Sequence, residues 1–278
     1  MRPDADGKLE ISFNHVYQDS YDDWNVYTYM YEDGKYIQLS EKNINLNSDE
    51  KVELPSIGVK TGGVYYIVVE QNYNVIGVDY TIKTSFTKTS YYEKEVNDTY
   101  AEATPMEIGK SYSGNISCGD DKDFYKITAP YSGYYKISFN HVYQNSYEDW
   151  NVYVYSYENG KYTELSNTNV DLNSDACVWL PSVGMNKGKI YFIKVERCCD
   201  VIGVDYSVKV SMSANGPSTI SAKSAKNSIK ISWKKATSVN GYEVYYKVGK
   251  TGKYKKYKST KKTAINFTNA KKRKEILF

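Results

Sequence analysis

The stretch that decides the fold occurs twice, as ISFNHVYQDSYDDWNVY at residues 11–27 and as ISFNHVYQNSYEDWNVY at residues 137–153. Adding 126 to each position from 11 to 86 gives its partner without a gap, and about 46 of these 76 positions are identical. Self-similarity over so long a stretch indicates internal duplication. Two interpretations follow: the twin stretch is an active-site signature kept in each copy, or it is ordinary strand and core chemistry.

The local pattern favours β-strands throughout. In WNVYVYSY at 150–157, Trp150, Val152 and Val154 alternate with polar and tyrosine positions, which is typical of a half-buried strand. An Asn-Gly pair follows within YENGKY at 157–162 and predicts a hairpin. Other segments, such as IYFIKV and DYSVKVSM, are short and rich in β-branched and aromatic residues. The sequence predicts an all-β fold built of β-sandwiches.

Both histidines of the chain lie in the twin stretch, at His15 and His141. Strand alternation places Ile137, Phe139 and His141 on one inward face, so each histidine is expected to be a hydrogen-bonded structural residue. Neither His-Glu-x-x-His nor Gly-x-Ser-x-Gly occurs, and no glycine-rich phosphate loop opens a helix. A catalytic histidine would need a nucleophile or metal partner that the sequence does not offer. We therefore expect sandwich framework and no enzyme.

Composition places the chain among soluble proteins of about two or three domains, with 278 residues, 25% charged residues and a mean hydropathy of -0.62. No run of 18 apolar residues exists, so we expect no transmembrane segment, and MRPDADGKLE does not resemble a signal peptide. Charge is concentrated in residues 217–278, which hold 17 Lys or Arg and two acids. This basic region could favour an anionic cell wall, or it is a solvated surface; no nucleic acid is expected.

The residues that precede the second twin stretch suggest a family. The segment EKEVNDTYAEATPMEIGKSYSGNISCGDDKDFYKI at 93–127 resembles the opening of the bacterial pre-peptidase C-terminal domain, a secreted jelly-roll-like β-sandwich. It is also similar to the related collagen-binding domain of clostridial collagenases. The resemblance rests on E-x-E-x-N-D, on a Ser-Gly turn and on D-D-x-D before an aromatic strand. DWNVYVYSYENGK at 149–161 continues it, with Asn151 where a second Asp is usual. It covers about 90–213, and partly 8–86.

The resemblance implies a calcium site. It carries this site onto six residues of copy two: Glu93, Glu95, Asn97, Asp98, Asp120 and Asp123. Calcium prefers about six to eight oxygen ligands, which carboxylates and a side-chain amide supply. The alternative is a solvated acidic linker and an acidic turn. Copy one lacks both acidic clusters, so no equivalent site is expected there.

Three domains are expected: a truncated sandwich at 1–86 (copy one), a complete one at 87–213 (copy two) and a partial immunoglobulin-like sandwich at 217–278. The last resembles a fibronectin type III domain, with Trp233 in one strand and Tyr242, Val244 and Tyr246 in the next. Its usual last two strands are replaced by KKRKEILF, so we expect a fragment of a larger secreted protein. The four cysteines are Cys118, Cys177, Cys198 and Cys199, all in copy two. They allow either a disulfide within the domain or four free thiols.

A row of tyrosines marks the candidate binding surface. Alternation turns the following side chains outward: Tyr153, Tyr155 and Tyr157 in copy two, and Tyr27, Tyr29 and Tyr31 in copy one. Such a row suits sugar rings or a peptide, or it packs against cross-strand neighbours. In clostridial relatives collagen recognition uses tyrosines of another strand, and the matching IYFIKVERC at 190–198 gives little support for collagen.

These features favour a non-catalytic, calcium-stabilised module, extracellular or at the cell surface, that attaches to a polysaccharide or protein polymer. The alternative is a structural spacer within a secreted peptidase or glycan-degrading enzyme, with the catalytic domain outside this chain.

Overall fold

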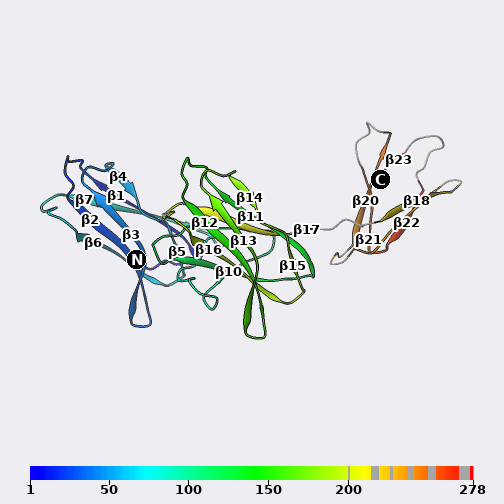
Figure 1. Cartoon of the computed structure of the whole chain (residues 1–278), viewed down its shortest axis with the longest axis horizontal. Helices are drawn as coiled ribbons and strands as arrows, with labels where there is room; N and C mark the ends of the chain where they lie inside the picture. The colour runs from blue at the N-terminus through cyan, green and yellow to red at the C-terminus, as the bar shows by residue number, and fades with distance from the viewer. Residues whose placement is uncertain are drawn as a thin grey trace. The chain divides into compact units, whose positions relative to one another are not determined.

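The computed structural model describes residues 1–199, 201–213, 219–225, 228–236, 239, 241–249, 255–268 and 276–277. The described residues form β-strands and no helix, which confirms the all-β fold class (Figure 1). The chain divides into two compact units. The first holds both copies except for two short segments, and the second is Met212–Phe278 together with these segments, Pro130–Tyr134 and Gly184–Lys187.

Copy one is a sandwich of two sheets. Its strands are β1 (Gly7–His15), β2 (Asp23–Glu32), β3 (Lys35–Asn45), β4 (Lys51–Glu53), β5 (Ile57–Val59), β6 (Val64–Gln71) and β7 (Tyr80–Lys88). In one sheet β1 pairs with β7 along one edge and with β4 and β5 along the other. In the other sheet β2 lies between β3 and β6. Leu9, Ile11 and Phe13 of the first sheet and Trp24 and Val26 of the second share one buried core.

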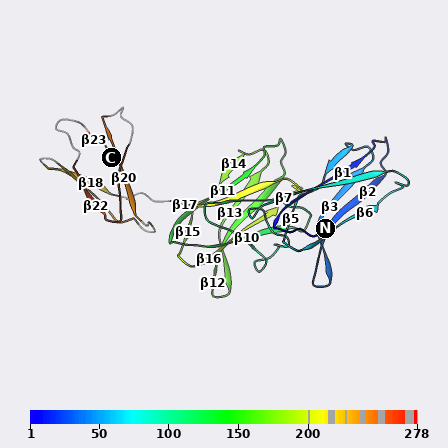
Figure 2. The ribbon, with the colours of Figure 1, turned by 180° about the vertical axis from the view of Figure 1, so that it is seen from behind.

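Copy two repeats this arrangement and adds three strands (Figure 2). Its strands are β8 (Thr104–Pro105), β9 (Ser111–Gly114), β10 (Lys122–Thr128), β11 (Gly133–His141), β12 (Asp149–Glu158), β13 (Lys161–Asp171), β14 (Cys177–Trp179), β15 (Val183–Met185), β16 (Ile190–Arg197) and β17 (Tyr206–Ser213). The sheets run β13-β12-β16-β10-β8 and β14-β11-β17-β9, with β15 also on β11. The additional strands are β8, β9 and β10: β10 closes the edge of β16, β9 closes the edge of β17, and β8 pairs with β10.

The distances between aromatic rings are nearly the same in the cores of the two copies. Phe139 lies 5.2 Å from Trp150 and 4.9 Å from Tyr206, ring centre to ring centre. The matching distances in copy one, from Phe13 to its own tryptophan and tyrosine, are 5.1 and 4.9 Å. Trp150, Val152 and Val154 are fully buried, as the alternation predicted.

The histidines complete this core. His141 is 7% exposed, its Nδ1–H donates to the Val142 carbonyl (3.2 Å), and its Nε2 accepts from the Ser174 hydroxyl (3.1 Å). His15 makes the same two bonds with Val16 and Ser48. Both ring nitrogens are therefore engaged in holding a strand end to a loop, and the structural interpretation of the twin stretch is confirmed.

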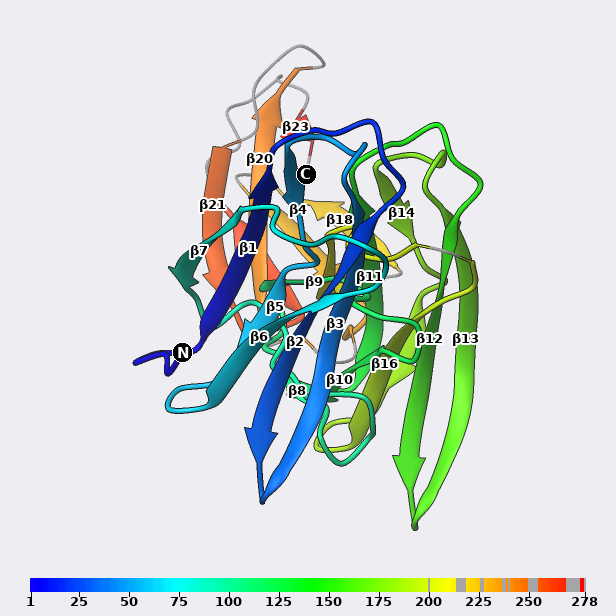
Figure 3. The same cartoon turned by 90° about the vertical axis from the view of Figure 1, so that its left-hand side faces the viewer.

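The predicted hairpin follows β12, and copy one has its counterpart after β2. Asn159 and Gly160 have positive φ angles of 52° and 76°, and Asp33 and Gly34 have 52° and 80°. Two consecutive residues with positive φ define the type I′ turn that suits twisted antiparallel strands. The hairpins β2–β3 and β12–β13 extend well past the rest of their sheets (Figure 3).

All four cysteines are free, so the structure has the second of the two alternatives and no disulfide within copy two. Cys118 is half-buried and the other three are exposed.

The second unit forms two small sheets. Its strands are β18 (Ile220–Ser224), β19 (Ile229–Trp233), β20 (Tyr242–Val248), β21 (Lys255–Thr260), β22 (Ala264–Phe267) and β23 (Ile276–Leu277). The sheet orders are β18-β19-β22 and β21-β20-β23. Trp233 and Val244 pack in one core on consecutive strands, as expected. Two residues near the end of KKRKEILF form a short strand, because Ile276 and Leu277 pair with β20. Residues 271–275 lie outside the described residues.

Candidate metal centre and tyrosine face

The acidic clusters meet where the chain passes from copy one to copy two. Tyr92 forms a parallel bridge with Ser113, and Glu93 N–H donates to the Ser113 carbonyl (2.9 Å). Four residues later, the Asn97 carbonyl accepts from Phe124 N–H (3.0 Å). The segment is thus held alongside the end of β9 and the start of β10. Glu93, Glu95 and Asn97 are all buried in this segment, whereas the residues between them are only partly buried.

Three carboxylates form the centre of the cluster. Glu93, Glu95 and Asp123 each place one oxygen within 4.8 Å of the others, and all three are at most 2% exposed. Asn97 is fully buried beside Asp123. Asp98 is half-buried, and its carboxylate accepts from Lys122 N–H (3.0 Å).

The expected ligand Asp120 lies elsewhere: its side chain is exposed, whereas that of the next residue, Asp121, is 6% exposed and turned inward. Asp121 interacts with Asp98 and raises the pKa of Glu95. The structure therefore brings five of the six expected residues together and adds Asp121 in the place of Asp120.

Hydrogen bonds hold the carboxylates of Glu93, Asp121 and Asp123. Asn115 N–H donates to Glu93 Oε1 (2.9 Å), and the Tyr206 hydroxyl donates to Asp123 Oδ2 (2.5 Å). Asp121 Oδ2 accepts from the backbone N–H (2.6 Å) and the hydroxyl (2.9 Å) of Ser117. The remaining oxygens are buried without a hydrogen-bond partner among the described residues: Glu95 Oε1, Asn97 Oδ1, Asp121 Oδ1 and Asp123 Oδ1. Buried polar atoms are normally satisfied, so these four require a partner.

The raised pKa values of the buried carboxyl groups also indicate that the cluster needs a partner. Burial raises the pKa of Asp123 to about 6, and burial together with Asp123 raises the pKa of Glu93 well above its ordinary value. The pKa of Glu95 is raised well above normal by burial and by neighbouring acids, which Lys60 offsets only in part. Charges buried without compensation are strongly unfavourable. The cluster therefore demands protons or a cation.

A hard divalent cation fits this donor set. All candidate ligand atoms are carboxylate or amide oxygens, which calcium prefers and thiophilic metals do not. Gly114 leaves the space that the arrangement needs, because a Cβ there would lie 2.2 Å from Glu93 Oε2. The residues present thus suit calcium.

Copy one supports the same segment from its other side. Glu95 N–H donates to the Gly58 carbonyl (3.3 Å), and Asn115 Nδ2 donates to the Ser56 carbonyl (2.7 Å). Val96 packs against the core of copy one. The candidate metal centre therefore lies at the junction of the two copies, a placement that the sequence did not predict.

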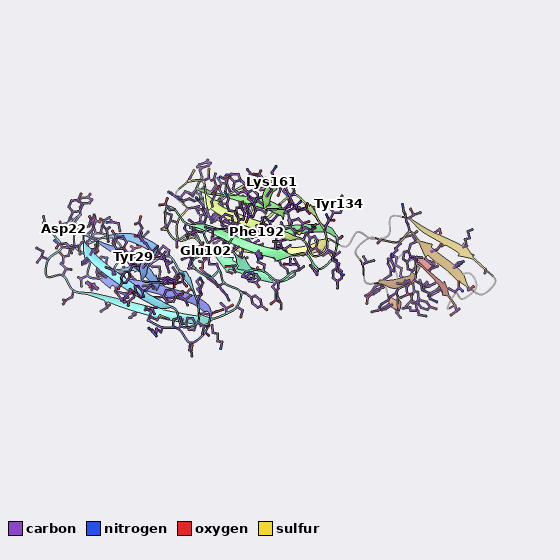
Figure 4. The ribbon with its side chains drawn as sticks, turned by 90° about the horizontal axis from the view of Figure 1, so that it is seen from below. Asp22, Tyr29, Glu102, Tyr134, Lys161 and Phe192 are labelled. Atoms are coloured by element: carbon purple, nitrogen blue, oxygen red, sulfur yellow. The ribbon has the colours of Figure 1, made fainter. Side chains whose placement is uncertain are left out.

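The tyrosine face differs between the copies. In copy two, Tyr155 and Tyr157 pack around buried Phe192, which is labelled in Figure 4. Tyr100, from the loop before β8, stacks on Tyr162 at 3.6 Å between ring centres and also contacts Tyr155 and Phe192. The ammonium group of Lys194 lies 4.1 Å from the ring centre of Tyr153. The outward tyrosines of copy two are therefore largely engaged by neighbours.

In copy one the corresponding aromatics are open. Tyr31, Tyr36 and Tyr66 are 40%, 64% and 42% exposed and form a cluster, with ring centres 4.9 Å (Tyr31 to Tyr36) and 5.5 Å (Tyr36 to Tyr66) apart. Tyr27 and Tyr29 continue the row, 6.0 Å apart; Figure 4 labels Tyr29. Copy one has no residue in the role of Tyr100 within the part of the chain that the structure describes.

Sequence reasoning named Tyr31 but missed Tyr36 and Tyr66. The signal was available, since Tyr36 follows the turn of the hairpin and both positions repeat as aromatics, Tyr162 and Phe192, in copy two.

No helix among the described residues is long and apolar enough to cross a membrane. No family model matches the chain, and no curated protein matches it. Among solved structures, the pre-peptidase C-terminal domain of a collagenase from Bacillus anthracis is 14% identical, with a TM-score of 0.30, and the match covers 39% of this chain and 94% of that one.

A mitogen from Yersinia pseudotuberculosis is 12% identical, with a TM-score of 0.29 and coverage of 40% and 90%. A tandem CBM22 domain of Xyn10C from Paenibacillus barcinonensis is 7% identical, with a TM-score of 0.24 and coverage of 77% and 80%. Likenesses this remote carry no conclusion about function.

Proposed function

We propose that this chain is a non-catalytic, calcium-stabilised module of a secreted or cell-surface protein that attaches to an extracellular polysaccharide or protein polymer. The observation that carries the proposal is the buried cluster of Glu93, Glu95 and Asp123 with its unsatisfied oxygens. A cluster of this kind is stable at neutral pH when a divalent cation balances its charge. Extracellular modules bind calcium with dissociation constants of about 10⁻⁴–10⁻³ M, which matches the calcium available outside cells.

Calcium would contribute stability rather than chemistry. Glu93, Glu95, Asn97, Asp121 and Asp123 would hold it, with Asp98 at the margin. Since these residues lie between β9, β10 and the loop that crosses from copy one, the ion would tie this loop to copy two. Asn115, Ser117 and Tyr206 orient the carboxylates and need no movement to do so.

Thermal unfolding tests the metal. Calcium should raise the melting temperature of the full chain over that in chelator, because a ligand that binds only the native state stabilises it by about 2.7 kcal/mol at a hundredfold excess over its dissociation constant. Asp123→Ala should abolish the rise, and Asp120→Ala should leave it intact because that side chain is exposed. Identical melting curves with calcium and with chelator would rule out the site.

The attachment surface that we propose is the open tyrosine face of copy one, formed by Tyr29, Tyr31, Tyr36 and Tyr66. Tyrosine combines a rigid apolar ring with a polar tip, so a cluster can stack against sugar rings or extended peptide at low entropic cost. Copy two carries the same residue types, but Tyr100 occupies its face. The two copies therefore provide an active surface and its built-in control.

Binding assays on insoluble polymers test this surface. The full chain would be incubated with bacterial cell wall, plant polysaccharides, collagen and mucin. Tyr31→Ser with Tyr36→Ser should abolish binding at an unchanged melting temperature, because both side chains are exposed. The matched pair Tyr157→Ser with Tyr162→Ser should lower the melting temperature and preserve binding, because Tyr162 stacks on Tyr100 and Tyr157 packs against the cluster around Phe192. Retained binding in the first variant would show that the face is not the surface.

A structural spacer is the second candidate. The observation in its favour is the bonded junction between the copies, where Lys8 pairs with Asp205 (2.7 Å) and Lys94 pairs with Asp6. If no polymer binds the wild-type chain, the spacer function is preferred, and the calcium centre then serves to stiffen this junction.

The basic region offers a separate contact with an anionic cell wall. Lys230, Lys258, Lys261 and Lys262 surround a shallow hollow in the second unit, and all are exposed. Attachment through them would weaken steeply with added salt, whereas attachment through tyrosines would not.

A further inference from the structure

A second group of metal-ligating side chains lies away from the calcium centre, at one end of copy two. Asp149 is the first residue of β12, and Cys198 and Cys199 directly follow β16. One carboxylate oxygen and the two sulfur atoms all lie within 4.8 Å of one another. The backbone fixes this arrangement, because Cys198 N–H donates to the Asp149 carbonyl (3.0 Å). Both thiols are exposed, so an ion can reach them from solvent.

Comparison with copy one shows which features of this group are shared by both copies and which occur only in copy two. Asn72 N–H donates to the Asp23 carbonyl at the same 3.0 Å, so the loop has the same course. Oδ1 of Asp23 and Oδ1 of Asp149 are both buried without a hydrogen-bond partner among the described residues. The carboxylate is therefore common to both copies, and the thiols distinguish copy two, where Cys198 and Cys199 replace Asn72 and Tyr73.

The chemistry of this donor set is soft. Two cysteine sulfurs with one carboxylate suit Zn²⁺ or Cd²⁺ and are poor ligands for calcium. Zinc lies about 2.3 Å from sulfur and 2.0–2.2 Å from oxygen, so tetrahedral ligands stand roughly 3.5–3.8 Å apart. Atoms within 4.8 Å of one another reach that spacing through small rotations of exposed side chains.

We propose that Asp149, Cys198 and Cys199 form a site for a thiophilic divalent cation, independent of the calcium centre. On binding, both thiols lose their protons to solvent, two metal–sulfur bonds form, and Asp149 provides the third ligand. No oxidant or reductant takes part. Three protein ligands leave a fourth position for water, as in open zinc sites.

Titration of the reduced, full-length chain with Cd²⁺ in the presence of calcium tests the site. Thiolate coordination to cadmium gives an ultraviolet charge-transfer absorption that oxygen ligands do not. The wild-type chain should show this absorption saturating at one equivalent, with release of protons. The double variant Cys198→Ser, Cys199→Ser should lose it, whereas Cys118→Ser and Cys177→Ser should keep it.

Copy one allows a gain-of-function control. Asn72→Cys with Tyr73→Cys beside Asp23 should create a second equivalent, because the loop and the carboxylate are already present. Asp149→Asn should weaken binding at least tenfold without removing the thiol absorption. The proposal is overturned if the double serine variant retains the full absorption, or if Cys198 and Cys199 resist reduction as a disulfide with each other. Neither result bears on the calcium centre, whose test is the melting temperature.

Discussion

The two copies share about 46 of 76 aligned residues and the same aromatic core, yet their edges differ. In copy two, Ile193 and Val195 of β16 are fully buried because β10 pairs alongside. Their counterparts on β6, Ile67 and Val69, remain partly exposed. Burial of these side chains is therefore decided by the neighbouring strand and not by the residues themselves.

In copy one, the first residue of the chain lies along this edge, in the position of the end of β10. The Met1 ammonium donates to the Tyr65 carbonyl (2.7 Å), and Tyr65 N–H donates back to the Met1 carbonyl (3.0 Å). This corresponds to the pairing of Ile127 with Tyr191 in copy two. Beyond Tyr65, β6 has no second strand partner among the described residues.

The side chains of β6 also give this edge less protection by charge than those of β16. Val68 and Gln71 stand where β16 has Lys194 and Arg197. Edge strands of soluble proteins are normally protected by charged residues, lysine above all. The open strand thus carries less charge than its covered counterpart, which makes it a site for pairing with another strand.

The largest expected effect is on amide hydrogen exchange. Amides of β6 and β7 should exchange at least about 100-fold faster than those of β16 and β17, because exchange from an uncovered edge needs only local opening. The difference corresponds to roughly 3 kcal/mol of opening free energy. Mass spectrometry of peptides from the full chain measures it. Equal protection of β6 and β16 would show that a second strand covers copy one in solution.

Paired truncations should show the next largest effect. Ile193→Ala should cost about 2–5 kcal/mol of unfolding free energy, because it leaves a cavity in a closed core. Ile67→Ala, at the equivalent position, should cost roughly 1 kcal/mol, because water already reaches the side chain. Denaturant unfolding of both variants gives the two values. Equal costs would mean that the cores of the two copies are equally closed.

The fold was predictable because its signals are local. Alternation in WNVYVYSY predicts the strand and its inward face, and the Asn-Gly pair predicts the hairpin. The structure confirms all three. The residues of the candidate metal centre were accessible through motif spacing, but the choice between Asp120 and Asp121 was not. It depends on how Ser117 turns the loop, since its N–H and hydroxyl draw Asp121 inward.

Contacts between distant segments could not be predicted in this way. Nothing near Tyr100 in the sequence indicates that its ring stacks on Tyr162, 62 positions later. The docking of Val96 on the core of copy one likewise depends on tertiary packing. Equivalent tyrosines therefore looked alike in the sequence, although Tyr162 stacks on Tyr100 while its counterpart Tyr36 is 64% exposed.

A pair of glycines tests the junction at which the proposed calcium centre lies. A Cβ on Gly58 would lie 1.9 Å from the Glu93 carbonyl oxygen, whereas on the equivalent Gly184 its nearest neighbour would be 3.9 Å away. Gly58→Ala should therefore destabilise by about 1–3 kcal/mol and weaken the calcium response, because Glu93 must move. Gly184→Ala should change the unfolding free energy by less than about 0.5 kcal/mol. Similar effects from the two substitutions would disprove the packing of Glu93 on copy one.

The smallest expected effect comes from Asp6, whose counterpart in copy two is Ser132. Both side chains accept a backbone N–H at 2.8 Å, from Thr61 and Lys187 respectively. Only Asp6 also pairs with Lys94, and this bond, together with the hydrogen bonds from Thr61, lowers the pKa of Asp6 from 3.8 to about 2. Asp6→Ser therefore keeps the turn and removes the ion pair, which at this exposure contributes about 0.2–1 kcal/mol.

The pH dependence of this small contribution has a definite sign. Because the pKa of Asp6 is lower in the folded chain, the folded state holds fewer protons, and the ion pair stabilises at every pH above about 4. The contribution should decline as the pH falls from about 4 toward 2, where Asp6 becomes protonated in both states. The measurement is the difference in unfolding free energy between wild type and Asp6→Ser across this range, which cancels the titration of the shared carboxylates. A difference that stays constant down to pH 2, or that grows as the pH falls, would mean that Lys94 does not hold Asp6 in its charged form.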